Sequence, residues 1–365
     1  MNITLCTSSL CRNASSNLAS PLGFSTATTL MIGGSIGIIP NIIIIAGIYL
    51  KSSLHKPTYY LIANLAASDI MLGIGTILNV ILALIDYQIG ISRKIHLLLC
   101  KIIVILPNTW SYTASIQTLV IISAERYQAI FRPTKVLTTR RVKWLCLIAW
   151  GISLIVSIPP AIDASIRRPK LRFCINNGKY TYWTTVINLV LFIFQFALPA
   201  VVMTVLYSLI LRQLSRGSIV GQIESRKSKK LKRRTIYMLL ITTFTFLALA
   251  TPWALTLAIV AITGKITSQI ISSTNNPTIR SIIRLSILML PFTTLYNPVI
   301  YCIFNNQIRQ LFIPTCKLFA RSKYFAVLPV AQQDSNNMNN KDSTPVVLTA
   351  HSQSLSKQDT LATIP

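Results

Sequence analysis

Four polar residues stand inside long apolar stretches of the sequence, and their side chains offer oxygen atoms for binding or proton chemistry. Asp69 interrupts the stretch from 58 to 85 and is the one acidic residue far from the end of such a stretch. Asn41, Ser115 and Asn297 lie at comparable depths in three other stretches. If these side chains converge, they would supply oxygen ligands for a hydrated cation such as sodium, or a carboxylate that takes up a proton. The alternative is that they only form hydrogen bonds between helices.

Two charged residues, Glu125 and Arg126, form the other candidate for chemistry. They lie in the segment from Ser123 to Phe131, where a run without any charge from 102 to 124 ends. A carboxylate and a guanidinium side by side can make a charge-assisted hydrogen bond at the rim of an apolar element. The plainer alternative is an interfacial pair that only marks the end of a helix.

The composition places these residues in a membrane protein. Of its 365 residues, 52% are hydrophobic and only 12% are charged, with a mean hydropathy of +0.58. Soluble domains carry about 25% charged residues, and a helix needs about 20 apolar residues to cross the hydrocarbon core. Lipid offers the backbone no hydrogen-bond partners, so each long apolar stretch predicts a helix. The seven stretches are 27–50, 58–85, 102–124, 144–162, 180–211, 235–264 and 285–308.

The Lys and Arg residues between the stretches indicate how the chain crosses the membrane. Cytoplasmic loops carry an excess of positive charge. The loops that start at Lys51, Glu125 and Arg212 contain 17 basic residues, against 11 in the alternate loops, so they are expected in the cytoplasm. Asn2 and Asn13 begin glycosylation sequons, which matter only on the exterior side. We therefore predict a multi-pass protein of the plasma membrane with an extracellular N-terminus.

The chain changes character twice beyond the seventh stretch. From 305 to 320, apolar residues recur at helical spacing with basic residues between them, which predicts a short amphipathic helix on the membrane surface. Beyond Arg321 the chain is rich in Asn, Gln, Ser and Thr. Hydroxyls between Ser335 and Thr363 could be kinase targets that recruit an arrestin, or the tail could be passive. The expected parts are an extracellular N-terminus (1–26), an all-α bundle of seven transmembrane helices (27–304), the surface helix (305–320) and a disordered cytoplasmic tail (321–365).

Three of the seven cysteines have placements that suggest chemistry. Cys100 lies at the outer start of the third stretch and Cys174 in the outer loop before the fifth, so both would face an oxidising compartment. They could form a disulfide that ties the loop to the helix, or remain free thiols. Cys316, among basic and apolar residues after the seventh stretch, is a candidate for palmitoylation.

Other classes of protein are less well supported by the sequence. The net charge of +27 suggests nucleic acid, but the basic runs lie between membrane spans, where attraction to membrane lipids explains them. A transporter is the alternative of another class, although the internal repeats and paths of intramembrane charge typical of transporters are not visible. An enzyme is not expected, since His55, His96 and His351 lie in predicted loops or the tail without metal-ligand spacing. No cofactor is expected apart from the sodium ion considered above.

Each of the seven stretches carries one or more residues of a recognisable pattern. They are, in order, Asn41, Leu65-Ala-Ala-Ser-Asp69, Glu125-Arg-Tyr127, Trp150, Pro199 with Tyr207, Pro252 and Asn297-Pro-Val-Ile-Tyr301. These residues resemble the signature positions of rhodopsin-like (class A) G-protein-coupled receptors, and the resemblance covers residues from about 27 to 320. Cys100 and Cys174 flank the bundle as in that family.

The resemblance implies a receptor that transmits the binding of an extracellular ligand to a heterotrimeric G protein. Glu125 would hold Arg126 at rest, and an outward swing of the sixth span would free Arg126 to meet the G protein, Tyr207 and Tyr301. Tyr127 completes the third-span motif. Prolines inside helices free backbone carbonyls and permit the kinks that such a swing requires. The prolines expected to do so are Pro199, Pro252 and Pro298.

Several features depart from the family pattern. Where the family usually has a tryptophan two residues before the sixth-span proline, this chain has Ala250, and Trp253 follows the proline instead. Lys232 stands near the position of an acid that latches the third-span arginine in many members, so that latch is expected to be absent. The segment from Cys100 to Arg126 is one residue longer than usual, which predicts an irregularity at the top of the third span.

The candidate ligand pocket comprises Asn108, Trp253 and Arg284. Asn108 stands where receptors for biogenic amines carry an aspartate, and no lysine from 285 to 308 could form the Schiff base of an opsin. The outer loops are basic, and the loop from 164 to 181 is long enough for a hairpin over the mouth. These features resemble peptide receptors and favour a neuropeptide. A receptor for a small anionic, nucleoside or lipid ligand is the alternative.

Overall fold

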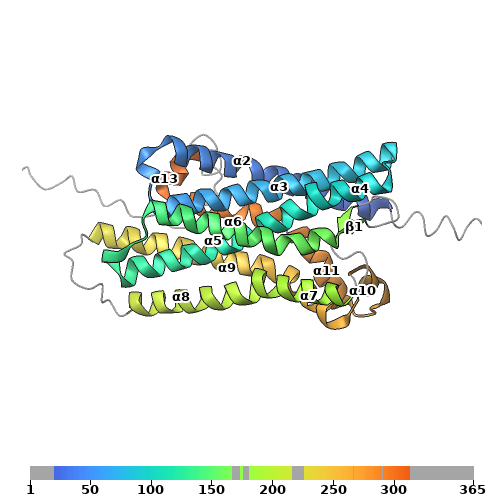
Figure 1. Cartoon of the computed structure of the whole chain (residues 1–365). Helices are drawn as coiled ribbons and strands as arrows, with labels where there is room; N and C mark the ends of the chain where they lie inside the picture. Colours follow the sequence, from blue (N-terminus) through green and yellow to red (C-terminus); the bar gives the residue numbers. More distant parts are fainter. Residues whose placement is uncertain are drawn as a thin grey trace, which may run out of the picture. The chain divides into compact units, whose positions relative to one another are not determined.

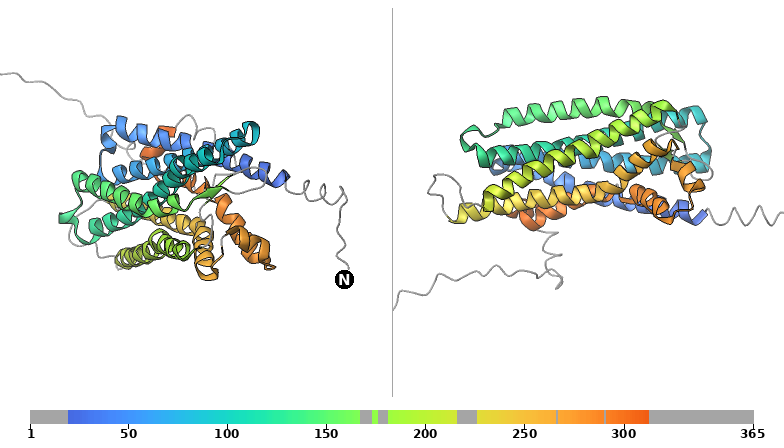
Figure 2. Two further views of the ribbon diagram at one scale, coloured as in Figure 1. Left: turned by 45° about the vertical axis from the view of Figure 1, so that its right-hand side comes forward. Right: turned by 90° about the horizontal axis from the view of Figure 1, so that it is seen from below.

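The chain folds into a bundle of long helices that run side by side, shown in Figure 1 and from two further directions in Figure 2. The computed structural model describes residues 20–166, 173–175, 181–215, 226–265, 267–289 and 291–312. The α-helices are α2 (Ser20–Leu50), α3 (Pro57–Ile89), α4 (Arg93–Leu99), α5 (Leu106–Phe131), α6 (Thr139–Ile162), α7 (Tyr182–Phe192), α8 (Leu198–Ser215), α9 (Arg226–Thr263), α10 (Thr267–Ser273), α11 (Pro277–Met289), α12 (Tyr296–Phe304) and α13 (Asn306–Arg309). The shorter elements are the 3-10 turns η1 (Ser52–Leu54), η3 (Pro133–Lys135), η5 (Pro291–Thr294) and η6 (Gln310–Phe312), the π-helical segments η2 (Cys100–Ile105) and η4 (Ile193–Ala197), and the strands β1 (Ser165–Ile166) and β2 (Cys174–Ile175).

Seven crossings of the membrane can be assigned within the described residues. Six continuous helical stretches are long and apolar enough to span, and α11 with α12 forms a seventh that bends by 45° at its break. This confirms the predicted all-α bundle of seven transmembrane helices.

Several helices extend beyond the apolar stretches that predicted them. α2 is already helical at Ser20, before the expected boundary at 27, and α3 continues to Ile89. α3 begins at Pro57, which suits the first turn of a helix, and stops at Gly90, whose φ of 76° is left-handed. Capping and backbone preferences set where each helix begins and ends, whereas the hydropathy of the sequence indicates only the part of the helix that lies in lipid.

The third and fifth spans each contain a π-helical segment. η2 widens the start of the third span and takes up the additional residue between Cys100 and Arg126, so the predicted irregularity is confirmed. η4 widens the fifth span directly before Pro199. Pro199 has no N–H to donate to a carbonyl of that segment, which weakens the regular helical ladder there. Nothing in the apolar pattern predicts η4.

The seventh span departs most from its predicted stretch of 285–308. It begins earlier, with α11, passes through η5 and ends at Phe304. The break lies before Pro298, which occupies the first turn of α12, where proline is tolerated. Pro298 lacks the N–H that would bond the Thr294 carbonyl, and that oxygen instead accepts a 2.8 Å hydrogen bond from Asn41 Nδ2.

The predicted surface helix is present as far as the structure describes it. α13 and η6 follow Asn305, whose Oδ1 accepts hydrogen bonds from the N–H groups of Gln307 and Ile308. Ile308 and Phe312 are buried and Arg309 is exposed, as expected for an amphipathic element. Outside the described residues lie the sequons at Asn2 and Asn13, Cys316, the rest of the surface helix to 320 and the tail from 321.

A signature tryptophan joins three spans in the interior. Trp150 of α6 donates a 3.0 Å hydrogen bond to Asn64 of α3, and Asn64 donates one of 2.8 Å to Thr118 of α5. Trp110 of α5 donates to the Trp150 carbonyl at 2.8 Å. Trp150 therefore fixes the packing of α3, α5 and α6.

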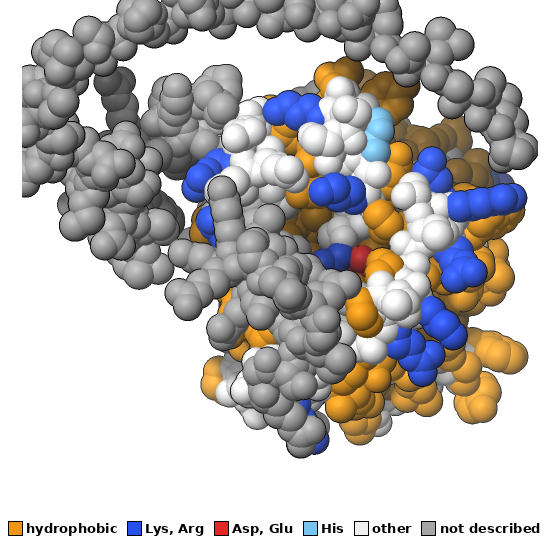
Figure 3. Space-filling view, turned by 90° about the vertical axis from the view of Figure 1, so that its left-hand side faces the viewer, with side chains coloured by type: hydrophobic (Ala, Val, Ile, Leu, Met, Phe, Trp, Pro, Cys, Tyr) orange, Lys and Arg blue, Asp and Glu red, His pale blue; other side chains and the backbone are white. Residues whose placement is uncertain are grey.

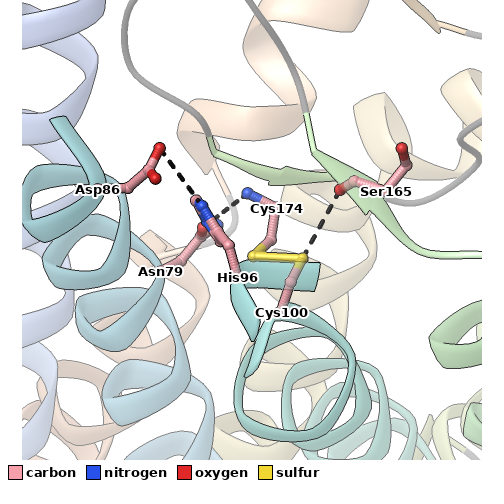
Figure 4. The surroundings of a disulfide bond; sticks show 6 residues. All are labelled: Asn79, Asp86, His96, Cys100, Ser165 and Cys174. Atoms are coloured by element: carbon pink, nitrogen blue, oxygen red, sulfur yellow. Dashed lines mark hydrogen bonds and ion pairs between the residues drawn. A yellow bond between two sulfur atoms is a disulfide. The ribbon is translucent and has the colours of Figure 1, made fainter. Parts of the chain in front are cut away.

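A hairpin and a disulfide lie at one end of the bundle, which we call the disulfide end (Figure 4). β1 pairs antiparallel with β2, with Ile166 opposite Cys174, and Cys174 is bonded to Cys100. Asn79 of α3 accepts a 3.0 Å hydrogen bond from the Cys174 N–H, and the Ser165 carbonyl lies 3.6 Å from Cys100 Sγ. The predicted disulfide and the predicted hairpin are both confirmed.

His96 is fully buried in α4, and its predicted place in a loop is wrong. Its Nδ1 lies 3.4 Å from Asp86 Oδ2, as Figure 4 shows, and Asp86 Oδ1 accepts a hydrogen bond from the Ile91 N–H. Sequence analysis missed this pair because the turn at Gly90 brings α4 back against the end of α3, and hydropathy does not report such a turn.

The first span packs closely on η5 at Gly37 of α2, and substitution of this glycine tests that packing. A Cβ at Gly37 would overlap the Thr294 side chain, whereas Gly151 of α6 has open space around it. We expect Gly37→Ala to lower the free energy of unfolding by about 1–3 kcal/mol through overpacking. Gly151→Ala should leave it unchanged or raise it slightly, because alanine favours helix. Thermal denaturation of the purified variants measures both, and equal stability of the two would contradict the close packing.

Candidate functional site

The charge pair lies at the other end of the bundle, which we call the Arg126 end. Glu125 is 2% exposed, Arg126 Nη2 donates to Glu125 Oε1 at 2.6 Å, and Nε donates to Oε2. Neighbouring residues of a helix point in different directions, so the long arginine side chain folds back to reach its neighbour. Tyr127 stacks on Phe131 instead, with ring centroids 4.5 Å apart. Figure 3 shows Lys and Arg side chains around this end face and an acidic side chain near its centre.

Thr58, at the start of α3, completes the hold on Arg126. Its hydroxyl accepts a hydrogen bond from Arg126 Nη2 and donates one of 3.3 Å to Glu125 Oε1. One hydroxyl thus contacts both charges and ties the second span to the third. Sequence analysis missed Thr58 because a threonine after Pro57 is an ordinary way to begin a helix.

Tyr207 and Tyr301 make no hydrogen bond with Arg126 within the described residues. The Tyr207 hydroxyl lies 3.4 Å from the Leu239 carbonyl and 3.2 Å from Thr243 Oγ1, both in α9. Tyr301 is buried, and its hydroxyl has no hydrogen-bond partner in the described part of the chain. In this arrangement Glu125 and Thr58 hold Arg126, and Tyr207 is bound to the sixth span.

A contact that was not predicted joins the sixth and seventh spans at the Arg126 end. Arg234 Nη2 donates a 2.9 Å hydrogen bond to the Ile303 carbonyl. Ile303 lies in the last turn of α12, where carbonyls lack helical partners and a cation is favoured. The sequence could not predict this contact, because the partner of Arg234 is a backbone carbonyl and not an acidic side chain. The side chain of Lys232 lies outside the described residues.

Three of the four predicted polar residues meet inside the bundle. Asn297 Nδ2 donates to Asp69 Oδ2 at 2.8 Å, and the Ser115 side chain lies beside the same carboxylate. All three are buried, and the Ser115 hydroxyl and Asn297 Oδ1 lie among the polar groups around the Asp69 carboxylate. Oxygen atoms around a carboxylate suit a hard cation. These residues therefore fit a sodium ion.

Asn41 belongs to a neighbouring contact rather than to this cluster. Its Nδ2 donates to the carbonyls of Gly37 and Thr294, at 2.8 Å each. No hydrogen bond joins Asn41 to Asp69 in the part of the chain that the structure describes. Because Thr294 precedes Asn297 by three residues, the hydrogen bond from Asn41 positions η5, which leads into the helix that carries Asn297.

The three pocket candidates do not form one hydrogen-bonded site within the described residues. Asn108 faces α3, where a Cβ at Gly75 would overlap Asn108 Oδ1. Asn108 is therefore part of the packing between the second and third spans. Arg284 is exposed on α11. Of the three, Trp253 is the one that joins a network between spans.

Gln195 of η4, which sequence analysis missed, is the centre of that network. Its Oε1 accepts a 3.2 Å hydrogen bond from Trp253 Nε1, and its Nε2 donates one of 2.9 Å to Thr113 Oγ1. Gln195 is 2% exposed and links the third, fifth and sixth spans. A signal was present, because a glutamine within a long apolar stretch must find hydrogen-bond partners.

The disulfide end carries an excess of positive charge. Its two described acids are engaged, Asp86 beside His96 and Asp163 beside Lys101. Burial raises the pKa of the Asp163 carboxyl, and the charge of Lys101 counters part of that rise. Lys101 Nζ also donates to the Ile162 carbonyl at 2.6 Å. No described salt bridge involves the other basic residues that the structure describes at this end, which are Arg93, Lys94, Lys265, Arg280 and Arg284.

Comparison with known proteins gives a family for this arrangement. The family described as "7 transmembrane receptor (rhodopsin family)" matches residues 40–301, more than half of the chain. C-X-C chemokine receptor type 1 of Rattus norvegicus is 28% identical over 221 residues, which cover 59% of this chain and 60% of that receptor. Neuromedin-K receptor of Oryctolagus cuniculus is 24% identical over 290 residues, 76% of this chain and 58% of that receptor.

A third relative is similar over a comparable part of the chain. Tachykinin-like peptides receptor 99D of Drosophila melanogaster is 25% identical over 286 residues, 74% of this chain and 53% of that receptor. The matches thus span about 60% or less of the length of these three relatives. A receptor family supports the prediction that the chain is not an enzyme and favours a receptor over a transporter. The chain belongs to the rhodopsin family of seven-transmembrane receptors.

Proposed function

We propose that this protein is a G-protein-coupled receptor of the plasma membrane, which binds a peptide at the disulfide end and activates a heterotrimeric G protein at the Arg126 end. The observation that carries the proposal is the hold on Arg126 by Glu125 and Thr58 at the rim of a receptor-family bundle. An arginine that can exchange these partners for others is a two-state element.

The sixth span would move between the two states. Pro252 lies inside α9 and removes one hydrogen bond from that helix, which permits bending there. An outward swing of the Arg126 end of α9 would separate Tyr207 from Thr243 and Arg234 from Ile303. Tyr207 would then be free to meet the released Arg126.

The ligand is proposed to be a peptide, in particular a neuropeptide. One relative is named as a receptor for tachykinin-like peptides, and the Lys and Arg side chains at the disulfide end that have no described salt bridge would attract a peptide with acidic groups or a free carboxylate. The same positive charge would also suit a small anionic ligand, which is the second candidate.

The disulfide end is proposed to face the exterior, together with the N-terminus. The prevalence of Lys and Arg in the loops of the Arg126 end supports this orientation. Glycosylation at Asn2 and Asn13, palmitoylation at Cys316, contact of the surface helix with membrane lipids, and phosphorylation of the tail with arrestin recruitment belong to the same proposal.

A sodium ion is proposed to bind at Asp69, Ser115 and Asn297. The ion would bind the side-chain oxygens of Ser115 and Asn297 and neutralise the buried Asp69 carboxylate. The cluster links α3, α5 and α12, so its occupancy would favour the packing seen here.

The role of Arg126 can be tested by substitution. Arg126→Ala should abolish G-protein activation with surface expression intact, because the guanidinium that meets the G protein is removed. Cells that express the chain, a peptide library and a panel of G-protein reporters measure basal and peptide-evoked signalling. Lys51→Ala, which changes an exposed basic residue at the same end, should signal like the wild type. Undiminished signalling by Arg126→Ala would reject the assigned role.

The contact between Arg234 and Ile303 is expected to restrain basal activity. Arg234→Ala should raise basal nucleotide exchange by about three- to tenfold, since a hydrogen bond from a charged group is worth about 1.5–3 kcal/mol when buried and less at a rim. Arg309→Ala, at an exposed arginine of α13, is the matched control. Basal exchange that is the same in both variants as in the wild type would show that the contact does not restrain the sixth span.

The sodium site predicts a salt-specific gain in stability. Sodium chloride should raise the melting temperature of the purified wild type above that in choline chloride of equal ionic strength, because a ligand of the native state stabilises it. Ser115→Ala should lose most of this difference. Ser153→Ala, at a buried serine of α6 outside the cluster, should keep it. A full sodium response in both Ser115→Ala and Asp69→Asn would count against the site.

A further inference from the structure

The hydrogen bonds of Gln195 have fixed directions. The indole N–H of Trp253 can only donate, so Gln195 Oε1 must face it. Thr113 donates its one hydroxyl proton to the Thr109 carbonyl at 2.7 Å, so it accepts from Gln195 Nε2. If the Gln195 amide were flipped, its Nε2 would face Trp253 Nε1, and both of these groups are donors. The network is therefore a directed chain from α9 through the fifth span to α5.

The backbone that carries Gln195 is irregular. η4 is π-helical, and Pro199 at its end offers no N–H to the carbonyls of Phe194 or Gln195. Single π-helical turns within helices are rare and frequently mark functional sites. The widened turn places Gln195 in the interior, where its amide contacts two other spans.

Trp253 connects this network to the helix that the proposed function requires to move. It follows Pro252 in α9, and its ring packs against the main core. Ala250, where the family usually has a tryptophan, is buried and has no donor. The Trp253 indole is therefore the aromatic group next to the proline, and Gln195 binds its single N–H.

We propose that Gln195 is a positioning residue that holds α9 in its resting place through Trp253, an inference that rests on the receptor function proposed above. A ligand that displaces the indole would break the bond to Gln195 and release α9 from the third and fifth spans. The bond occurs in the same arrangement in which Glu125 holds Arg126, so both contacts belong to one resting state.

A double-mutant cycle on basal nucleotide exchange tests this inference. Gln195→Met keeps the size of the side chain, removes both hydrogen bonds and should raise basal exchange about fivefold, as expected for one buried hydrogen bond. Trp253→Phe removes the same bond from the other side and should act in the same direction. Basal exchange in the double variant should be only slightly higher than in the stronger single variant, because both substitutions remove the same hydrogen bond between Gln195 and Trp253.

Fluorine NMR of protein labelled with fluorotryptophan supplies a readout that a general loss of stability would not mimic. The Trp253 signal is assigned by its absence in Trp253→Phe. It should shift in Gln195→Met, and it should shift in the wild type when an activating peptide binds. Gln88→Met is the matched control, since Gln88 is exposed near the end of α3 and takes part in neither hydrogen bond of Gln195. It should leave the Trp253 signal in place.

The outcomes separate this inference from the function on which it rests. Wild-type basal exchange and an unshifted Trp253 signal in Gln195→Met would overturn the role of Gln195, as would additive effects in the double variant. If Gln195→Met does not fold, Trp253→Phe and Thr113→Val test the same chain of bonds, and wild-type exchange in both would overturn it. Failure of the proposed function is different, because the wild type itself would then activate no G protein with any peptide.

Discussion

Lipid offers no hydrogen-bond partner to a backbone carbonyl, and this constraint governs the breaks in the fifth and seventh spans. Where the seventh-span proline frees the Thr294 carbonyl, Asn41 of α2 donates to it. Where Pro199 interrupts the fifth span, Gln117 of α5 donates to the Phe194 carbonyl. At both places a side chain of another helix satisfies the carbonyl that the proline leaves without a helical partner. The breaks that permit movement are also the points at which the spans hold one another.

The lack of hydrogen-bond partners in lipid also explains why the polar contacts are few and directional. Most of the bundle is held by apolar packing around residues such as Leu65, Ile116 and Leu119, which is strong but has little preference for one helix position over a nearby one. Hydrogen bonds at Arg126 and Gln195 are individually modest, yet each depends on a single geometry. A structure of this kind can change state by exchanging a handful of polar partners while its core stays packed.

The two ends of the bundle are connected through its middle. The cluster at Asp69 joins α3, α5 and α12, and Asn297 within it lies one helical turn from Tyr301. Gln195 joins α5 and α9 at another level. The third span takes part in both contacts and also carries Arg126. A change at the disulfide end can therefore reach the Arg126 end through α5 and the two spans that contact it.

The sequence alone determined the membrane class and the number of crossings, because hydropathy is a local property of the chain. Cysteine placement, loop length and motif spacing predicted the disulfide, the hairpin and the irregularity at the top of the third span, and the structure confirmed all three. The sequence also identified Asp69, Asn297 and Arg126 by their charge or polarity in apolar surroundings. Only the tertiary structure decided their partners. Thr58 and Arg234 have ordinary local contexts, Asn41 serves η5 rather than the cluster, and His96 is buried by a turn. Hydrogen-bond partners from different helices are set by how the helices pack, and no local pattern encodes that packing.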